Sequence, residues 1–143
     1  MSERIPIALA KLVRRRAREV CEYCLLPQSS QEAAFHLDHV QPRSVHGPTR
    51  VDNLALACVT CSLKKAARTH GRDPVSNEWV PLFNPRQDSW SAHFRWSRGC
   101  RLLGRTATGR ATILALGMNR PAVIAVRQAL VKLGRLSLGT GVE

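Results

Sequence analysis

Apolar residues near the amino terminus recur three or four positions apart, which is the spacing of one face of a helix. They are Leu9, Leu12, Val13, Ala17 and Val20. Basic residues occupy the remaining faces: Lys11, Arg14, Arg15 and Arg18. The pattern predicts an amphipathic basic helix, and we assign residues 1–17 to it as a separate segment. Such a face either binds phosphate or is simply solvated, and the pattern fits both.

Two extended apolar segments follow, separated by a loop. Residues 33–40 predict a strand, and residues 51–59 predict a second one. The prolines and the glycine within residues 42–48 interrupt both patterns and predict a loop between the strands. Residues 63–68 then predict a short helix. The expected order is therefore strand, loop, strand and helix.

The remaining residues, 73–143, predict an aromatic-rich segment followed by a helical extension. The aromatic residues are Trp79, Phe83, Trp90, Phe94 and Trp96. They favour a satellite hydrophobic core over a surface that stacks on bases. Two helices are predicted, at 111–116 and 121–133, ended by Gly117 and Gly134. In the second, apolar residues repeat at core-facing spacing: Val123, Val126, Leu130 and Leu133.

Four of the cysteines form two C-x-x-C pairs. The pairs are Cys21 with Cys24, and Cys58 with Cys61. Two thiolates two residues apart can reach one metal, and zinc prefers four such ligands in a tetrahedron. Disulfides or thiol redox chemistry are the alternatives, but the start of the chain lacks the features of a secretion signal. The spacing therefore favours a structural zinc site, with Cys100 expected to be a buried small apolar residue.

The charge of the chain indicates a polyanionic partner. The 22 Lys and Arg residues exceed the 10 Asp and Glu residues, giving a formal charge of +12. Nucleic acid, most simply DNA, fits this excess. A membrane is not expected, because no apolar stretch approaches the roughly 20 residues of a spanning helix. We expect a cytoplasmic protein.

Three stretches within residues 18–72 resemble the zinc-knuckle branch of the HNH endonucleases. They are residues 21–24, 35–43 and 52–61, followed by Lys64 and Lys65. The resemblance covers about residues 18–70 and combines several residue types at fixed positions. It implies a small α+β fold of the ββα-metal type, in which a hairpin and a helix grip one divalent cation and a four-cysteine zinc site staples them.

The same resemblance assigns roles to individual residues. It makes His39 the general base, Asp38 a ligand of a catalytic Mg²⁺ or Mn²⁺, and Asn53 the residue that fixes the hairpin loop. These residue types suit phosphodiester hydrolysis, because histidine, with an ordinary pKa of about 6.5, can deprotonate water near neutral pH. A hard cation on a carboxylate stabilises the leaving oxygen. Singly, each residue also fits an ordinary strand, cap or turn position.

One position departs from the family pattern. Many members carry His or Asn directly after the last cysteine as a second ligand of the catalytic cation, and here that residue is Ser62. Serine at a helix start commonly serves as a cap. His36 is an alternative ligand, because on a strand it shares a face with Asp38.

The resemblance therefore predicts a metal-dependent DNA endonuclease. Arg43, Lys64 and Lys65 are the expected nucleic-acid contacts. The alternative from another class is a zinc-stabilised nucleic-acid-binding module that is inactive or only weakly catalytic. One active site cuts one strand, so a monomer and a homodimer both remain open.

Overall fold

The computed structural model describes residues 4–139. Its internal contacts divide the chain into two units. The first contains the chain up to Thr69 together with Asn84–Gln87, and the second contains His70–Phe83 and the chain from Asp88 onward. The amino-terminal helix belongs to the first unit and is not a unit of its own. No helix among the described residues is both long and apolar enough to span a membrane.

The first helix, α1 (Ile7–Arg16), follows Pro6 and buries Val13. It is shorter than the apolar pattern predicts, because Arg18 and Glu19 have positive φ angles and cannot continue a helix. Two of its arginines hold it to the rest of the unit through backbone carbonyls. Arg14 donates to the carbonyl of Phe35, and Arg16 donates to those of Val51 and Leu54.

An antiparallel hairpin forms the centre of the first unit. Its strands are β1 (His36–His39) and β2 (Leu54–Ala57), and His39 lies opposite Leu54. All four residues of β2 are buried. The connection contains two short 3-10 helices, Arg43–Val45 and Val51–Asn53. Gly47 is required between them, since a Cβ there would lie 1.7 Å from the carbonyl oxygen of Gln41.

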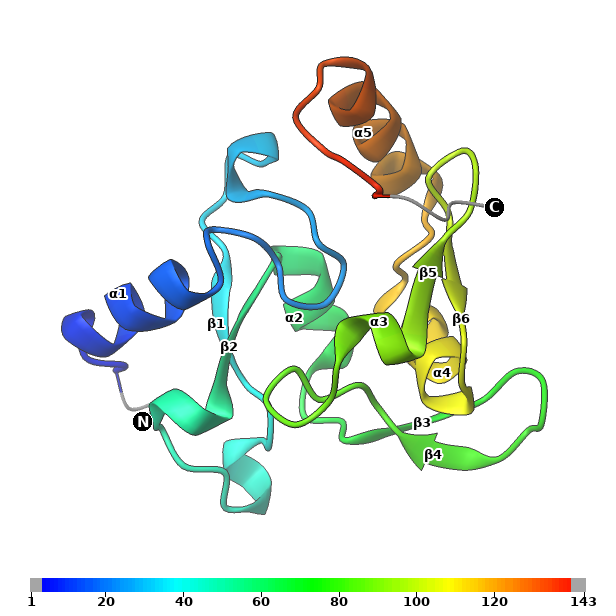
Figure 1. The fold of residues 1–143 in the computed structure, drawn as a ribbon. Coiled ribbons are helices and arrows are strands. Elements are labelled where there is room, and N and C mark those ends of the chain that lie inside the picture. The colour runs from blue at the N-terminus through cyan, green and yellow to red at the C-terminus, as the bar shows by residue number, and fades with distance from the viewer. Residues whose placement is uncertain (1–3, 140–143) are drawn as a thin grey trace. The chain divides into compact units, whose positions relative to one another are not determined.

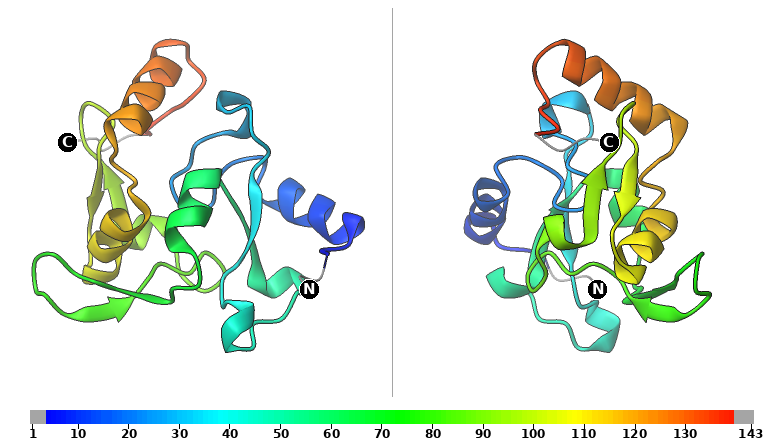
Figure 2. Two further views of the ribbon diagram at one scale, coloured as in Figure 1. Left: turned by 180° about the vertical axis from the view of Figure 1, so that it is seen from behind. Right: turned by 45° about the vertical axis from the view of Figure 1, so that its right-hand side comes forward.

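Helix α2 (Val59–Lys65) follows β2 and packs on both strands of the hairpin. Figures 1 and 2 show α1 and α2 on opposite sides of the β1–β2 hairpin. The helix begins four residues before the predicted start at residue 63, because the sulfur of Cys58 caps it by accepting the N–H of Cys61. It ends at Ala66, which has a positive φ of 49°.

The described part of the second unit, up to residue 139, contains two further hairpins and three helices. The strands are β3 (His70–Arg72) paired with β4 (Trp79–Pro81), and β5 (Phe94–Trp96) paired with β6 (Leu102–Gly104). The helices are α3 (Trp90–His93), α4 (Ala107–Leu116) and α5 (Pro121–Lys132). Helix α4 packs against β3, β4 and β6. It ends at Gly117 as predicted, in a left-handed conformation.

The predicted aromatic core lies in the second unit. The rings of Phe83 and Phe94 meet edge to face at 5.2 Å, and those of Trp90 and Trp96 lie 5.8 Å apart. Trp79 is an exception, with 63% of its surface exposed.

Of the residues predicted to face the core, Val123 and Leu130 in α5 are buried, whereas Leu133, directly after the helix, is 68% exposed. Arg127, on the same helix, is also buried, and the carbon of its guanidinium lies 5.1 Å from the centre of the Trp96 ring. It also donates to the carbonyl of Cys100, which is buried as predicted.

Candidate metal centre and active site

The two C-x-x-C pairs converge on one point. The first pair lies between α1 and β1, and the second caps and enters α2. All four side chains are buried, and their sulfur atoms lie within 4.8 Å of one another. None forms a disulfide. The sulfurs of Cys24 and Cys58 are 3.7 Å apart.

This arrangement fits a structural zinc ion. Tetrahedral zinc with Zn–S bonds of about 2.3 Å holds its sulfurs roughly 3.8 Å apart, close to the separation of the Cys24 and Cys58 sulfurs. Hydrogen bonds from the neighbouring thiols lower the pKa of Cys58, while the same contacts raise the pKa of Cys61. The four-cysteine cluster is therefore a possible zinc site.

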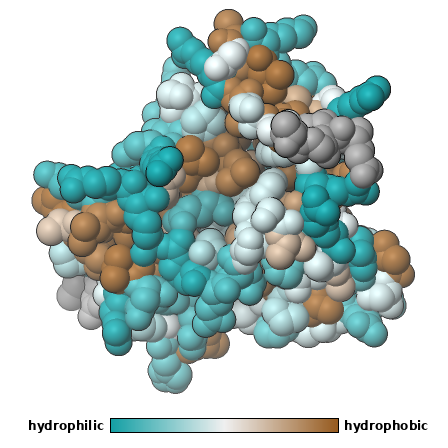
Figure 3. Space-filling view, viewed as in Figure 1, coloured by the Kyte–Doolittle hydropathy of each residue, from teal (hydrophilic) through white to brown (hydrophobic). Residues whose placement is uncertain are grey.

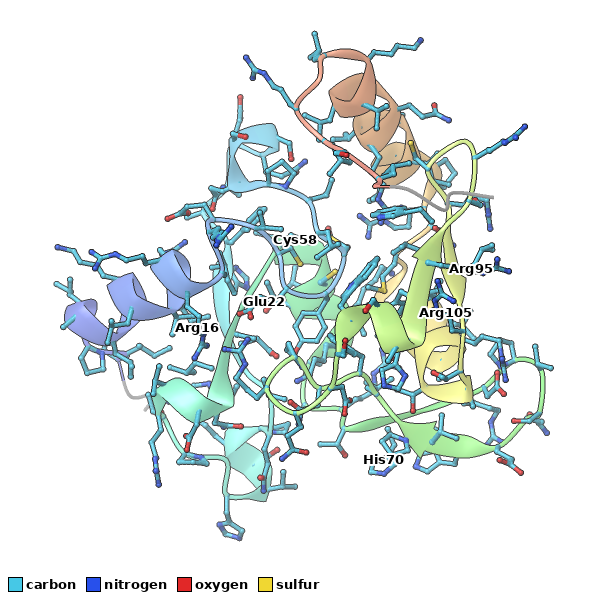
Figure 4. The ribbon with its side chains drawn as sticks, viewed as in Figure 1. Arg16, Glu22, Cys58, His70, Arg95 and Arg105 are labelled. Carbon is cyan, nitrogen blue, oxygen red and sulfur yellow. The ribbon has the colours of Figure 1, made fainter. Side chains whose placement is uncertain are left out.

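Glu22, inside the first pair, joins this centre to the hairpin. Its backbone N–H donates to the carbonyl of Leu56, and its carboxylate accepts the N–H of Leu56 at 2.8 Å. Arg86 forms an ion pair with the same carboxylate. Figure 4 labels Glu22, Cys58 and Arg16, the last of which reaches the hairpin from α1. Glu22 thus adds contacts between the first cysteine pair and β2 to those that a bound metal would make.

Asp38 is buried in the middle of β1, on the side of α2. Its Oδ2 atom accepts a hydrogen bond from the Tyr23 hydroxyl at 2.7 Å and lies 3.1 Å from the Nζ of Lys65. The same ammonium donates to the other carboxylate oxygen at 3.4 Å. Burial, and then the negative charge of Asp38, raise the pKa of Tyr23 well above its ordinary value, so its hydroxyl remains a donor.

Lys65 was expected to contact nucleic acid, and the structure corrects this expectation. The side chain is 2% exposed. Besides the Asp38 carboxylate, its ammonium donates to the carbonyls of His39 and Val40, at 3.2 and 3.1 Å. A buried lysine at the end of α2 therefore ties the helix to β1. Its exposed neighbour Lys64 stays available for the predicted contact.

His36 and Ser62, the two tentative ligands of the catalytic cation, lie next to each other. The Nδ1 atom of His36 is 2.9 Å from the hydroxyl of Ser62. Ser62 does not cap α2, because the helix already begins at Val59 and Cys58 holds the cap position. His36 and Asp38 on β1 and Ser62 on α2 therefore lie where the strand and the helix face each other. The side chains of His36 and Ser62 are in direct contact.

His39 stands at the end of β1 and is partly exposed. Its Nε2 atom accepts a hydrogen bond from the Nε of Arg43 at 3.2 Å and lies 2.9 Å from the hydroxyl of Thr49. Because the Arg43 group only donates, Nε2 carries a lone pair and the proton of the neutral ring is on Nδ1. This assignment follows from the hydrogen-bond partners.

The surroundings of His39 keep its imidazole neutral. Burial has the largest effect and lowers the pKa of His39 below its ordinary value of 6.5. The positive charge of Arg43 lowers this pKa further, and the charge of Asp38 opposes the change. A neutral imidazole with a lone pair on Nε2 has the chemistry of a general base near neutral pH.

Asn53 connects both ends of the loop that carries these groups. Its amide donates to the carbonyls of Gln41 and Pro48, at 3.0 and 2.9 Å. Its carbonyl oxygen accepts the N–H of Gln41 at 2.9 Å. The side chain is 9% exposed. These three bonds join the two ends of the loop next to His39.

The outer face of α1 is strongly basic. A shallow cavity there is lined by Lys11, Arg14, Arg15, Arg18 and Glu19. Figure 3 shows hydrophilic side chains extending over α1, beside hydrophobic ones. Arg14 is partly occupied by its bond to Phe35. The remaining cations of this face, Lys11, Arg15 and Arg18, are exposed.

Two residues that contact the site were not assigned a role from the sequence. Tyr23 lies inside the first cysteine pair, and its position within a knuckle is the only signal that pointed to it. Thr49 lies in the loop between the strands, and no periodicity marks it. Its contact with His39 depends on how the loop folds back.

Comparison with known proteins gives one match. The sequence model of the HNH endonuclease family matches residues 21–68. This range begins at the first cysteine pair, contains the hairpin and ends just after α2. No curated protein and no solved structure matches the chain. The predicted resemblance is confirmed: residues 21–68 match the model of the HNH endonuclease family, and the four cysteines within them form a possible metal site.

Proposed function

We propose that the HNH domain of residues 21–68 is an endonuclease that hydrolyses phosphodiester bonds in DNA, with His39 as its general base. The family match supports a nuclease. The observation that carries the role of His39 is the lone pair on its Nε2, next to the guanidinium of Arg43. The basic face of α1 supports a nucleic-acid substrate.

The reaction requires a proton acceptor and a group that holds the phosphate. In the proposed step, His39 removes a proton from water as the water oxygen bonds to phosphorus. The bond from phosphorus to the 3′ oxygen breaks, and that oxygen takes a proton from solvent. The products are a 5′-phosphate and a 3′-hydroxyl. Thr49, 2.9 Å from Nε2, marks where the attacking water would bind.

Arg43 is proposed to act on the phosphate as well as on the base. Its Nε already donates to His39, which fixes the guanidinium beside the proposed water. Arginine offers several donors in one plane, so on substrate binding the guanidinium can pass from the His39 lone pair to a phosphate oxygen, and Nε2 is then free to accept the proton of water. This would put a positive charge next to the phosphorus under attack.

The catalytic cation expected from the family does not fit the arrangement found here. Both oxygens of Asp38 are already bound, by Tyr23 and by the buried ammonium of Lys65. Within residues 4–139, the four cysteines are the only cluster of three or more His, Cys, Asp or Glu side chains placed to share a metal. We therefore assign no step to Mg²⁺ or Mn²⁺. A cation at Asp38 would have to replace Lys65.

A second candidate function follows from the same contacts. A domain whose key carboxylate is neutralised by Lys65, and whose next ligand position is Ser62, is suited to bind nucleic acid without cutting it. This is the zinc-stabilised binding module. It predicts the same zinc content and DNA affinity as the nuclease, without cleavage.

The test is nicking of supercoiled plasmid by the zinc-loaded protein with Mg²⁺, with Mn²⁺ and without added divalent cation. Cleavage that yields 5′-phosphate ends supports the nuclease. Cleavage without added cation would agree with an Asp38 carboxylate that is already bound by Tyr23 and Lys65, whereas strict Mg²⁺ or Mn²⁺ dependence would show that a divalent cation takes part in the reaction. Binding without cleavage under all three conditions would establish the binding module.

A further inference from the structure

The second unit contains an open cavity of about 590 Å³ that is separate from the candidate active site. Four arginines line it: Arg95, Arg101, Arg110 and Arg120. Figure 4 labels Arg95, on β5, and Arg105, just beyond β6, in this part of the unit. Its volume is within the range of sites for small organic ligands.

Aliphatic side chains form the apolar part of the lining. Leu102 and Leu103 come from β6, and Ile113 and Leu114 come from α4. Leu102 is buried, whereas Leu114 is 63% exposed. The cavity therefore combines an aliphatic surface with guanidinium groups. This combination suits a ligand that has both flat apolar groups and negative charges.

Two sets of bonds make the cavity wall rigid. Arg110 forms a two-bond ion pair with the buried Asp73, with both N–O distances 2.9 Å. Asn119 binds the backbone of Leu102 twice, accepting from its N–H and donating to its carbonyl, each at 2.8 Å. The wall is therefore formed before any ligand arrives, which lowers the entropic cost of binding.

The lining has a positive net charge. It includes four arginines and no Asp or Glu. Arg110 is neutralised by Asp73, and the hydrogen bonds from Arg110 hold the pKa of Asp73 well below its usual range. The other three arginines lie on different segments: Arg95 on β5, Arg101 before β6 and Arg120 before α5. Their charges are spread around the cavity instead of meeting at one point.

We propose that this cavity binds a segment of single-stranded nucleic acid. Separated guanidiniums match the successive phosphates of a strand better than a single phosphate. An unpaired base can cover the aliphatic surface, whereas the bases of a duplex are already stacked on each other. The proposal takes its partner class from the proposed function, but it does not require cleavage.

The test measures the affinity of the full-length zinc-loaded protein for a short fluorescein-labelled oligothymidylate by fluorescence anisotropy. The His39→Ala background prevents cleavage, so failure of this proposal is distinguishable from failure of the nuclease proposal. Arg95→Gln combined with Arg120→Gln should raise the Kd about tenfold and reduce the slope of log K against log salt by about 0.7 for each lost contact. Leu114→Glu should also weaken binding.

The matched control is Arg98→Gln, which removes one exposed arginine of the same hairpin that does not line the cavity. Circular dichroism checks that every variant is folded. Two results would overturn the proposal. One is an unchanged Kd in both the double arginine variant and Leu114→Glu. The other is binding of thymidine monophosphate or polyglutamate as tight as that of the oligonucleotide at equal ionic strength.

Discussion

The ammonium of Lys65 lies 3.1 Å from a carboxylate oxygen of Asp38, and both side chains are buried. The pair joins the last residue of α2 to the centre of β1, one residue before the candidate base His39. A charge in this position is costly without its partner. The ion pair therefore stabilises the domain and, at the same time, occupies the Asp38 carboxylate that another ligand would need.

Replacing Lys65 with Met should destabilise the domain strongly. The substitution leaves the Asp38 carboxylate buried without its counter-ion, which typically costs about 3–5 kcal/mol. The double variant Asp38→Asn with Lys65→Met removes both charges and should recover much of this loss. Chemical denaturation of the zinc-loaded protein measures each free energy of unfolding.

Lys64→Met is the matched control, because it removes a neighbouring exposed lysine of the same helix. It should change the free energy of unfolding by less than about 0.5 kcal/mol. Equal losses for Lys64→Met and Lys65→Met would contradict the buried ion pair.

Removal of zinc should unfold the hairpin and α2 together. One cysteine pair precedes the hairpin and the other lies at the start of α2, so a bound metal links these two elements. No disulfide joins the cysteines. We expect one zinc per chain by mass spectrometry of the metal content, and loss of helical circular dichroism on chelation. Cys58→Ser should bind zinc weakly, whereas Cys100→Ser should retain the full zinc content. Full structure in the chelated protein would contradict this role.

The periodicity of the sequence placed the strands β1 and β2 and the two carboxyl-terminal helices, because each has a run of apolar residues with clear stop signals, but it placed α2 only in part. Boundaries were less well predicted. Helix α2 begins at Val59, since a cysteine sulfur and not Ser62 provides its cap. Patterns of apolar residues carry no information on such a contact.

The acid limb of the activity profile should have a midpoint below pH 6.5, because burial and Arg43 lower the pKa of His39 from that ordinary value. The neutral form is therefore retained at pH 7. Arg43→Gln removes one positive charge and should move the midpoint upward, and titration of the His39 ring protons by NMR measures the shift directly. A fixed midpoint would exclude Arg43 as a cause.

Stability should follow the same titration. A depressed pKa means that the folded state binds the proton less well than the unfolded state does. Neutral His39 therefore contributes to the free energy of unfolding above pH 6.5. This contribution is lost as the pH falls through the lower pKa that His39 has in the folded state. Thermal denaturation of the parent and of His39→Ala across this range should show a pH dependence that is smaller in the variant.

Asn53→Asp should loosen the loop beside His39. The carboxylate keeps the acceptor for the N–H of Gln41 but faces the carbonyls of Gln41 and Pro48 without donors. The loss of these bonds should cost about 1–3 kcal/mol in the free energy of unfolding. Asp52→Asn, an exposed change next to it, is the control. Faster hydrogen exchange at residues 41–48 in Asn53→Asp, but not in Asp52→Asn, would agree with an Asn53 side chain that holds the loop.

The four-cysteine metal centre was predicted better than the contacts around it. The spacing of the cysteines indicated one metal centre, because the C-x-x-C geometry is local. The burial of Lys65 was not predicted, because its direction depends on how α2 crosses β1. Lys64 and Lys65 look alike in the sequence, yet they lie on different sides of the helix.

The most direct test of the central claim compares nicking of supercoiled plasmid by the parent protein and by His39→Ala, in the cation condition that gives the parent its highest rate. His46→Asn, an exposed histidine in the same loop, is the control, since asparagine tolerates its positive φ of 66°. We predict a rate lower by about 10²- to 10⁴-fold in His39→Ala alone, with unchanged zinc content and DNA affinity. Equal nicking rates in the parent and His39→Ala would contradict the claim that His39 is the general base.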